Sequence, residues 1–374
     1  VTDMTTSYPN ESTQNSLFKK IEQSRRPPTK MSDSHITLAH GSGGKAMRDL
    51  IEDIFVSNFD NSFLSQLEDQ ATFDFKNFTK HGDRLAFTTD SYVISPLFFP
   101  GGNIGELAVH GTVNDLAVSG AKPLYLSCGM IIEAGFPTDS LRKIVKSMKR
   151  AADEAGVKIV TGDTKVVHRG AADKLFINTA GVGVIRSGIS ISAQNIQVGD
   201  VIIVNGYLGD HGAAIMMARG DIHIQTEIQS DTQALNGLVD SILDVCMEVR
   251  GMRDVTRGGL ATVLNEFAMS SKVGIRLFEK KLPVREKVWG VCEILGLDPL
   301  YFANEGKLVT VVPPDKAETV LKAMKSHPAG IDSAIVGEVF ATSTDSPGIL
   351  LLQTKFRTER VVDMLTGDQL PRIC

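Results

Sequence analysis

The stretch FTTDSYVISPLFFPGGNIGELAVHGTVNDLAVSGA, residues 87–121, decides the fold of this chain. It overlaps the run RLAFTTDSYVI at 84–94, which predicts a strand with Asp90 near its middle. Its second half, from Ile104 onward, predicts a helix that stops at Gly120. A strand and a helix therefore follow each other closely, and both carry an aspartate among apolar residues.

Asp115 is the unusual residue of that helix. At helical spacing it falls on the apolar stripe of the helix, which is formed by Ile104, Ala108, Gly111 and Val118. A carboxylate in such a place destabilises the fold unless a partner or a bound cation compensates for its burial. The small side chains of Ala108 and Gly111 would let a ligand or another backbone come close.

The composition excludes several classes of protein. With 374 residues the chain is long enough for two domains, and 42% hydrophobic and 22% charged residues are typical of a globular protein. A net charge of −5 gives no basic field for nucleic acid or an anionic membrane, and no apolar run is long enough to span a bilayer. The amino end also lacks the pattern of a secretory signal. The four cysteines form no CxxC pair, which favours a reducing cytoplasm over a zinc site or disulfides; they are Cys128, Cys246, Cys292 and Cys374.

The chain divides into four segments by composition. We expect a disordered extension at 1–34, a first domain at 35–189, a second domain at 190–352 and a mobile polar tail at 353–374. Strand and helix patterns alternate without a regular βαβ rhythm, so an α+β fold is favoured over a doubly wound sheet. The second domain begins a new round of strand, glycine-rich turn and helix at QVGDVIIVNGYLGDHGAAIMMARG.

A glycine cluster, HGSGGKA at residues 40–46, precedes the first predicted helix. Its backbone amides, the helix amino end and Lys45 would suit phosphate oxygens. The spacing of a Walker A loop is missing, and a plain flexible turn is the alternative.

Three further aspartates stand at the edges of apolar segments. Asp163 lies in VTGDTKVV two residues before Lys165, Asp254 precedes the glycine turn VTRGGL, and Asp69 lies in LEDQATFD. Each by itself fits a helix cap or an edge salt bridge. Together with Asp90 and Asp115 they favour Mg²⁺ sites that bridge the phosphates of ATP, because Mg²⁺ prefers hard oxygen ligands.

The motif YFANEGKL places Glu305 just before a predicted strand. Glu305 would serve as a general base if burial raised its pKa, and a solvated turn carboxylate is the alternative. His40, His110 and His211 lack the spacing of metal ligands and are expected to be satisfied or surface histidines.

The chain ends in LPRIC, with a thiol on its last residue, Cys374. A thiol on a free end can move between sites as a carrier, although a lone terminal cysteine can also have no role. The segment of roughly twenty residues, at ~3.3 Å each when extended, would reach several tens of ångströms.

Taken together, these motifs closely resemble the HypE family of hydrogenase maturation factors, from about residue 35 to 374. The segments that carry the resemblance are LAHGSGGKAM, residues 87–121, YLSCG, VTGDTKVV, DKLFINTAG, GDHGA, DVTRGGL, FANEGKL and PRIC. This family is similar in turn to aminoimidazole ribonucleotide synthetase and selenophosphate synthetase. The resemblance implies a two-domain, ATP-using synthetase-like fold with an α/β carboxyl-terminal domain. It also implies a homodimer in which the amino-terminal domains pair into a β-barrel beside the ATP.

The resemblance also implies a reaction. In this family HypF, a carbamoyltransferase, loads the terminal cysteine with a carbamoyl group, and ATP-dependent dehydration converts it to a thiocyanate. The cyanide then passes to iron on the HypC–HypD complex, for [NiFe]-hydrogenase. Cys374 matches the carrier cysteine, and we expect Glu305 to be the base, with Lys165 either as its partner or as a group that binds the substrate oxygen. The nucleotide contacts implied by the resemblance are Gly43, Gly44, Lys45, Asn114 and Asp163, and the Mg²⁺ ligands are Asp69, Asp90, Asp115 and Asp254.

Two other functions remain alternatives on these residues. One is an enzyme of the same superfamily that phosphorylates a small free substrate, which would not need the terminal PRIC. The other is a scaffold without catalysis that presents its thiol to a metal, against which the aspartates and the glycine turns argue.

Overall fold

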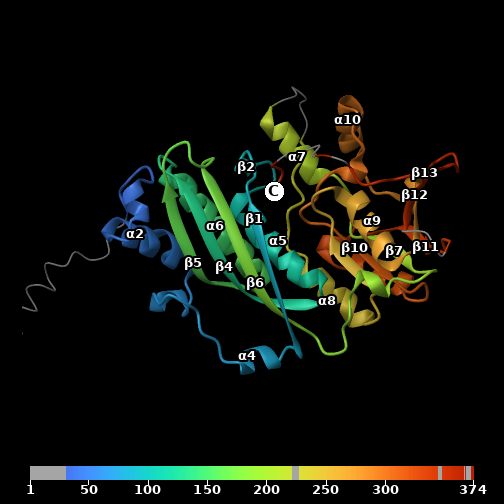
Figure 1. Cartoon of the computed structure of the whole chain (residues 1–374), viewed down its shortest axis with the longest axis horizontal. Coiled ribbons are helices and arrows are strands. Elements are labelled where there is room, and N and C mark those ends of the chain that lie inside the picture. The colour runs from blue at the N-terminus through green and yellow to red at the C-terminus, as the bar shows by residue number, and fades with distance from the viewer. Residues whose placement is uncertain (1–30, 221–226, 344–347, 366, 368–371) are drawn as a thin grey trace, which may run out of the picture.

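The computed structural model describes residues 31–220, 227–343, 348–365, 367 and 372–374 (Figure 1). It contains two domains side by side, each built on one sheet, and the prediction of a two-domain mixed α and β protein is confirmed. The predicted extension at 1–34 lies outside the described residues except for 31–34. Within these four residues, the backbone N–H of Met31 donates to Asp53.

The amino-terminal domain has a four-stranded sheet in the order β1-β6-β4-β5. β6 pairs antiparallel with both of its neighbours, whereas β4 and β5 run parallel. The strands are β1 (Arg84–Tyr92), β4 (Ala121–Glu133), β5 (Lys158–Val167) and β6 (Leu175–Ile185), with a small separate pair, β2 (Phe98–Phe99) and β3 (Gly102–Asn103). The strand predicted at 84–94 is therefore confirmed to within two residues.

Helices α5 and α6 cover one face of this sheet (Figure 1). The opposite face exposes apolar side chains, among them Leu85, Phe87 and Ile131. The helices of the domain are η1 (Leu38–Gly41), α2 (Lys45–Leu50), η2 (Ile51–Val56), α3 (Ser57–Phe59), η3 (Leu64–Gln66), α4 (Lys76–Thr79), α5 (Ile104–Val118) and α6 (Thr138–Ala155).

Helix α5 is the central element of the molecule. Asn103 caps it by accepting a hydrogen bond from the backbone N–H of Gly105, and Gly120 follows its end with a positive φ. Every residue of α5 except Asp115 is buried, because α5 contacts the sheet, α6 and two elements of the second domain, α8 and β8. The buried residues include the polar side chains of Glu106, His110, Thr112 and Asn114, so the helix is buried on every side without being apolar on every side.

Gly111 has a different role from the one that the sequence suggested. A Cβ atom at this position would lie 2.2 Å from the hydroxyl oxygen of Tyr92, so the space beside the helix belongs to a side chain of β1. The sequence suggested that a ligand or another backbone would come close here, whereas the close neighbour at Gly111 is the side chain of Tyr92.

The carboxyl-terminal domain has a seven-stranded sheet in the order β13-β12-β9-β11-β7-β10-β8. Its strands are β7 (Val201–Val204), β8 (Gly251–Asp254), β9 (Gly274–Phe278), β10 (Leu308–Val312), β11 (Ala334–Phe340), β12 (Ile349–Gln353) and β13 (Glu359–Val361). Helix α9 packs in the hydrophobic core on one side of the sheet, while α8 and α11 pack in the core on the other. The helices are η4 (Ala193–Asn195), α7 (Asp210–Arg219), α8 (Asn236–Val245), α9 (Gly259–Ser271), η5 (Glu279–Lys281), α10 (Glu286–Leu295), η6 (Pro299–Tyr301), α11 (Ala317–Lys325) and η7 (Pro328–Gly330).

The segment predicted as a mobile tail, 353–374, is partly integrated into the body. Its first residue, Gln353, ends β12, and residues 359–361 form β13 in the same sheet. The last residues, 372–374, lie between β1 and α7, where the carboxyl terminus is marked in Figure 1. The described parts of this segment are therefore bound to both domains.

We predict that Gly111→Ala destabilises the protein even though alanine is the better helix former. The substitution gains about 1 kcal/mol of helix propensity but forces Tyr92 to move, and such overpacking costs roughly 1–3 kcal/mol. Urea unfolding should show a net loss. The matched control is Gly290→Ala inside α10, where a Cβ meets no atom within 4 Å and where we expect a small gain. A stabilised Gly111→Ala protein would contradict the packing described here.

Candidate active site at the domain interface

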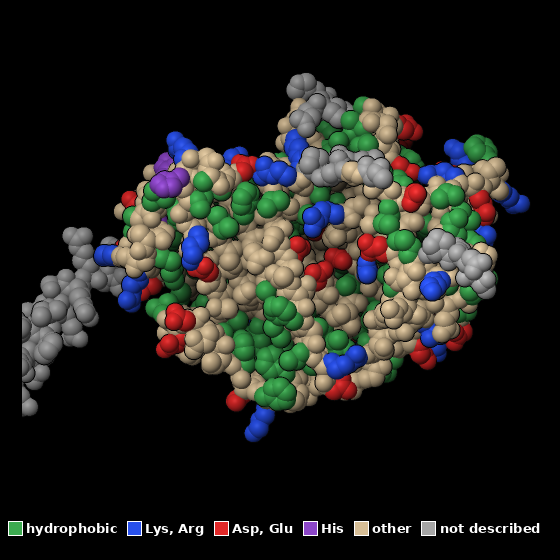
Figure 2. Space-filling model, viewed as in Figure 1, with side chains coloured by type: hydrophobic (Ala, Val, Ile, Leu, Met, Phe, Trp, Pro, Cys, Tyr) green, Lys and Arg blue, Asp and Glu red, His purple; other side chains and the backbone are tan. Residues whose placement is uncertain are grey.

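Four acidic residues from four different elements meet where the two domains join. Asp90 lies on β1, Asp115 on α5 and Asp254 at the end of β8, while Glu305 precedes β10. Each of Asp115, Asp254 and Glu305 has its pKa raised in part by at least one other member of the group. Figure 2 shows acidic side chains gathered in the central hollow between the domains. We call these four residues the acidic cluster.

Glu305 is the most deeply buried member of the acidic cluster. Its side chain is 3% exposed, and burial, then Asp254, Asp231 and Asp90, raise its pKa well above the ordinary value. Its Oε1 atom has no hydrogen-bond partner among the described residues. Of the two environments considered for Glu305, the structure shows the buried one.

Asp254 and Asp115 are also held in conditions that oppose ionisation. Burial, then the charges of Asp115 and Asp90, raise the pKa of Asp254 to about 7. Burial also raises the pKa of Asp115, although the Thr88 hydroxyl donates to its carboxylate at 2.9 Å. Carboxylates that repel one another in this way form a site that favours a cation.

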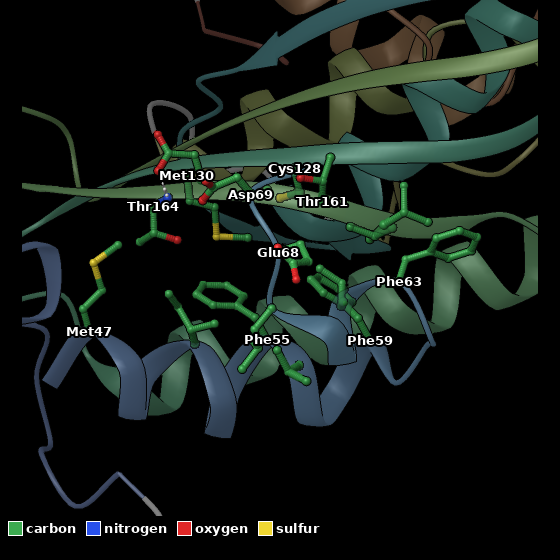
Figure 3. A pocket seen from close by; sticks show the side chains of 18 residues that line it. Met47, Phe55, Phe59, Phe63, Glu68, Asp69, Cys128, Met130, Thr161 and Thr164 are labelled. Atoms are coloured by element: carbon green, nitrogen blue, oxygen red, sulfur yellow. Dashed lines mark hydrogen bonds between the residues drawn. The ribbon is translucent and has the colours of Figure 1, made fainter. Parts of the chain in front are cut away.

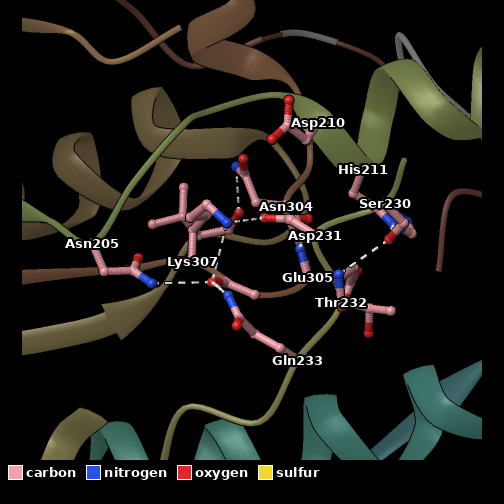
Figure 4. Close-up of polar contacts among 12 residues, drawn as sticks. Asn205, Asp210, His211, Ser230, Asp231, Thr232, Gln233, Asn304, Glu305 and Lys307 are labelled. Atoms are coloured by element: carbon pink, nitrogen blue, oxygen red, sulfur yellow. Dashed lines mark hydrogen bonds and ion pairs between the residues drawn. The ribbon is translucent and has the colours of Figure 1, made fainter. Parts of the chain in front are cut away.

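A buried ion pair stands behind Glu305. Lys307 Nζ lies 2.9 Å from Asp231 Oδ2, and the backbone N–H of Glu305 donates to Asp231 Oδ1 at 3.0 Å (Figure 4). Burial raises the pKa of Asp231, but the positive charge of Lys307 lowers it, and the net effect is a lowered pKa. Asp231 therefore remains ionised and keeps its ion pair with Lys307. Asp231 therefore fixes the backbone that carries Glu305.

Amide side chains fix the rest of the loop at 304–307. Asn205 and Gln233 both donate to the carbonyl of Gly306 at 3.1 Å (Figure 4). Asn304 donates to the Val255 carbonyl at 2.8 Å, next to Asp254 in the chain. The loop is thus held in place from three directions, and the position of Glu305 with it.

Asn114 links the two domains. Its Oδ1 accepts from the backbone N–H of Leu235 at 2.8 Å, and its Nδ2 donates to the Gln233 carbonyl at 3.1 Å. These contacts engage both ends of its amide with the chain itself. Asn114 therefore holds the segment at 233–235 against α5, next in the chain to Asp115 of the acidic cluster.

Asp69 and Asp163 lie elsewhere, in a pocket between the η2 and α3 helices and strands β4 and β5 (Figure 3). The pocket has a volume of about 420 Å³ and is mostly apolar inside, with Glu68 as a third acidic residue. Register places Asp90 and Gly162 in one row across the four strands, so Asp163 lies at the far edge of the sheet, about 14 Å from β1.

The predicted cationic residues are engaged near this pocket. Lys165 Nζ lies 2.7 Å from Asp163, and the predicted pairing of Lys165 with Glu305 is not formed in the described part of the chain. Lys45 Nζ lies 2.7 Å from Asp49 within α2. Gly43 has a positive φ, and a Cβ atom added at Gly43 or at Gly44 would meet no atom within 4 Å, so the glycine cluster forms an open turn before α2.

The chain terminus lies between the two domains. The backbone N–H of Val93 donates to the Cys374 carbonyl at 3.1 Å, directly after Tyr92, whose phenol is in the electrostatic field of Glu305. His211 Nε2 lies 2.8 Å from the Ile373 carbonyl, and its charge environment includes Asp231. The terminus therefore contacts both domains.

Several residues of this site were not predicted. His211, Asp231 and Arg219, whose Nη2 donates to the Arg372 carbonyl at 2.7 Å, had no local spacing that indicated a function, although GDHGA, which contains His211, is one of the shared motifs. All three histidines singled out, His40, His110 and His211, are buried with hydrogen-bond partners, so the expectation of satisfied histidines is confirmed. Cys128, Cys246 and Cys292 are buried.

We predict that Asp254 makes stability depend on pH in the absence of metal and nucleotide. Its pKa in the folded protein, about 7, exceeds the value of 3.8 expected after unfolding, so the folded state binds more protons between these values. The stabilisation is present below pH 4 and is lost as the pH rises through 7. Urea unfolding of Asp254→Asn should therefore show a stability gain over the parent that grows from pH 5 to pH 8. The exposed Asp315→Asn is the control, and a pH-independent difference for Asp254→Asn would contradict the assignment.

Comparison with known proteins identifies the fold. Residues 67–185 match the amino-terminal domain, and residues 197–348 the carboxyl-terminal domain, of AIR synthase related proteins. The carbamoyl dehydratase HypE of Rhodobacter capsulatus is 52% identical over 342 residues, covering 91% of this chain and 99% of that protein.

Two solved structures are similar over nearly their whole length. A hydrogenase maturation protein HypE in complex with ATP has a TM-score of 0.85 and 46% identity, covering 90% of this chain and 99% of that one. The HypE of a HypE–HypF complex has a TM-score of 0.73 and 47% identity, covering 84% and 99%. The two domains, the motifs and this level of identity agree, and the chain belongs to the HypE family of carbamoyl dehydratases within the AIR synthase related proteins.

Proposed function

We propose that this protein dehydrates an S-carbamoyl group on its own Cys374 with ATP and yields a thiocyanate, ADP and phosphate. The cyanide group then supplies the iron ligand of a [NiFe]-hydrogenase. The observation that carries this proposal is the position of residues 372–374 between the two domains, where Val93 and His211 bind their main chain. A small-substrate enzyme would not need its own terminus there.

The chemistry explains why ATP is needed. The oxygen of a carbamoyl group is a poor leaving group, so its attack on the γ-phosphate of ATP converts it to a phosphate ester and releases ADP. Loss of phosphate and of the two nitrogen protons then forms the C≡N bond. The protein must position the terminus against the nucleotide and accept protons, which is the part that its own residues supply.

Glu305 is the proposed proton acceptor. A carboxylate with a raised pKa holds a proton more strongly than an exposed one, which suits removal of an N–H proton. Because Oε1 has no partner among the described residues, it is open to a donor from a bound substrate. Asp231 keeps the backbone of Glu305 in place.

The acidic cluster fits Mg²⁺ as a shared ligand set rather than as a closed cage. Among the described residues no three His, Cys, Asp or Glu side chains come close enough to hold a metal by themselves. Mg²⁺ usually takes one or two carboxylates together with phosphate oxygens and water, and it would neutralise the phosphate charge here. We propose Asp90, Asp115 and Asp254 as these carboxylates.

We assign the pocket of Asp69 and Asp163 to the nucleotide as well. Its apolar interior suits a base, its acidic residues suit a metal-bound phosphate chain, and the open turn of Gly43 and Gly44 lies at the start of the helix that supplies Met47 to the pocket. Lys45 and Lys165 would have to exchange their present carboxylate partners for phosphate. The ATP complex of a similar protein supports nucleotide binding by this fold.

The partners follow from the proposed reaction. HypF is the proposed source of the carbamoyl group, and the solved complex of a similar protein with HypF supports this. The HypC–HypD complex is the proposed acceptor of cyanide. We place the reaction in the cytoplasm; among the described residues no helix is long and apolar enough to cross a membrane.

We also propose that the protein is a homodimer. Phe87, on the sheet face opposite α5, is 72% exposed, and Leu85 and Ile131 are exposed on the same face by strand alternation. A second copy placed there would cover these side chains and bring two four-stranded sheets together.

The function is tested by intact-mass measurement of the carboxyl-terminal peptide after incubation with HypF, carbamoyl phosphate and Mg-ATP. We expect Cys374 to gain a carbamoyl group and then to lose one water. Glu305→Gln should accept the carbamoyl group but lose water at least a hundredfold more slowly, by roughly the 10²–10⁴-fold contribution of a general base. Cys374→Ser should show neither change. Unmodified Cys374 beside an active HypF would refute the carrier proposal and favour a small-substrate enzyme.

The dimer is tested by Phe87→Asp, which places a charge at the centre of the proposed contact. We expect light scattering after size exclusion to show a dimer for the parent and a monomer for the variant, because a buried unpaired charge is costly. Phe356→Asp, at a phenylalanine that is equally exposed on the other domain, should remain dimeric. A dimeric Phe87→Asp protein would place the interface elsewhere.

A further inference from the structure

Residues 372–374 occupy a socket between the domains, and we propose that His211 is the positioning residue that sets how long Cys374 stays docked in it. The consequence for catalysis rests on the proposed function, whereas the socket itself stands on geometry. We call residues 372–374 the terminal segment.

The socket binds the main chain of the terminal segment. Each of its three consecutive carbonyl oxygens accepts a hydrogen bond from the body, and no bond in this set involves a side chain of the segment. The bonds run from Ser95 N (3.4 Å) and Arg219 Nη2 (2.7 Å) to Arg372 O, from His211 Nε2 (2.8 Å) to Ile373 O, and from Val93 N (3.1 Å) to Cys374 O. Chemical change at the terminal sulfur therefore leaves these bonds in place.

Side chains anchor the segment on the amino-terminal domain. Ile373 is 3% exposed and packs in the core of that domain, and Cys374 packs against the same core. Arg372 Nε donates to the Val93 carbonyl at 3.0 Å, and its guanidinium pairs with Asp173. The segment is therefore held on the amino-terminal domain by burial as well as by hydrogen bonds. His211 and Arg219 hold it from the carboxyl-terminal domain.

The hydrogen bonds of His211 fix its tautomer. A carbonyl oxygen only accepts, so the contact with Ile373 places the proton on Nε2. Nδ1 is then the acceptor, and it lies 2.7 Å from the hydroxyl of Ser230, which must donate. The backbone N–H of Thr232 donates in turn to the Ser230 oxygen at 3.2 Å. The direction of every bond in this chain is set, and it ends at the terminal segment.

The surroundings of His211 support a neutral, immobile ring. The side chain is fully buried, and Phe99 packs against it edge-on with ring centroids 5.7 Å apart. Burial lowers the pKa of His211, which keeps the neutral donor form. A replacement without a donor at Nε2 would leave the Ile373 carbonyl without this partner.

Two needs of the terminal segment oppose each other. The partner that loads Cys374 must reach its thiol, so loading favours the undocked segment, while dehydration favours the docked one. A weaker His211 contact should therefore speed loading and slow dehydration. General damage to the fold would slow both.

The direct test is the rate at which iodoacetamide alkylates Cys374 in the folded protein, followed by peptide mass. The other three cysteines are buried, so they serve as internal references. We expect His211→Phe, which keeps a ring but loses the donor, to raise the rate about five- to tenfold, as expected for one lost hydrogen bond. His211→Gln, whose amide N–H can take the place of Nε2–H, should stay within about twofold of the parent.

Two further variants complete the design. Ile373→Ala removes the buried anchor from the terminus itself, where it does not endanger the fold, and should also raise the rate. His327→Phe alters a histidine of the same domain that contacts Ala329 instead of the terminal segment, and should leave the rate unchanged. Unchanged alkylation in both His211→Phe and Ile373→Ala would refute the socket.

The same proteins then enter loading by HypF and single-turnover dehydration of the loaded chain. Faster loading with slower dehydration in His211→Phe, restored in His211→Gln, supports a positioning role. If both steps slow together in His211→Phe, the positioning role is wrong. If alkylation rises as expected but no variant, nor the parent, is ever loaded, the socket stands and the proposed function fails.

Discussion

The burial of helix α5 on every side is the constraint on which the rest of the structure depends. Because the helix packs against its own sheet, against α6 and against two elements of the second domain, its position fixes how the domains meet. Asp115 is its only residue that is not buried, and it faces the junction. Asn114 beside it holds the segment at 233–235, which leads on to α8 and lies next to the loop of Glu305. Packing in one core thereby determines the geometry of charges that come from four elements.

How much the sequence predicts depends on the range of the interaction. Helix periodicity correctly predicted that Asp115 lies in a helix among apolar residues, and the strand pattern correctly predicted Asp90 in a strand. Both predictions succeed because they rest on local properties of the sequence. The burial of Glu305 remained open, since it depends on tertiary contacts, and the residue that holds its backbone, Asp231, is 74 residues away in the chain. The pairing of Lys165 with Asp163 is local. A sequence pattern alone could not decide between this neighbour and the distant Glu305 as the partner of Lys165.

The docking of the terminal segment illustrates the same limit. Its contacts with His211 and Val93 span 162 residues and most of the chain, respectively. A polar segment with a terminal thiol is typical of a free end, and only the complementary surface, with a core position for Ile373 and donors for three carbonyls, shows that it is bound. The space at Gly111 was similarly open to any close neighbour until the fold assigned it to Tyr92.

Under the proposed function the substrate is carried on Cys374 of the enzyme itself, and this gives kinetics of a different kind from those of an enzyme with a free substrate. The reacting group is present once per polypeptide at an effective concentration set by the socket, so the chemical step is first order in protein and has no Michaelis constant for the carbamoyl group. Each molecule completes one cycle and must then be emptied before it can be reloaded. Under that proposal the yield of cyanide would follow the number of polypeptides and the frequency of their encounters with donor and acceptor, and the protein would act as a stoichiometric shuttle as much as a catalyst.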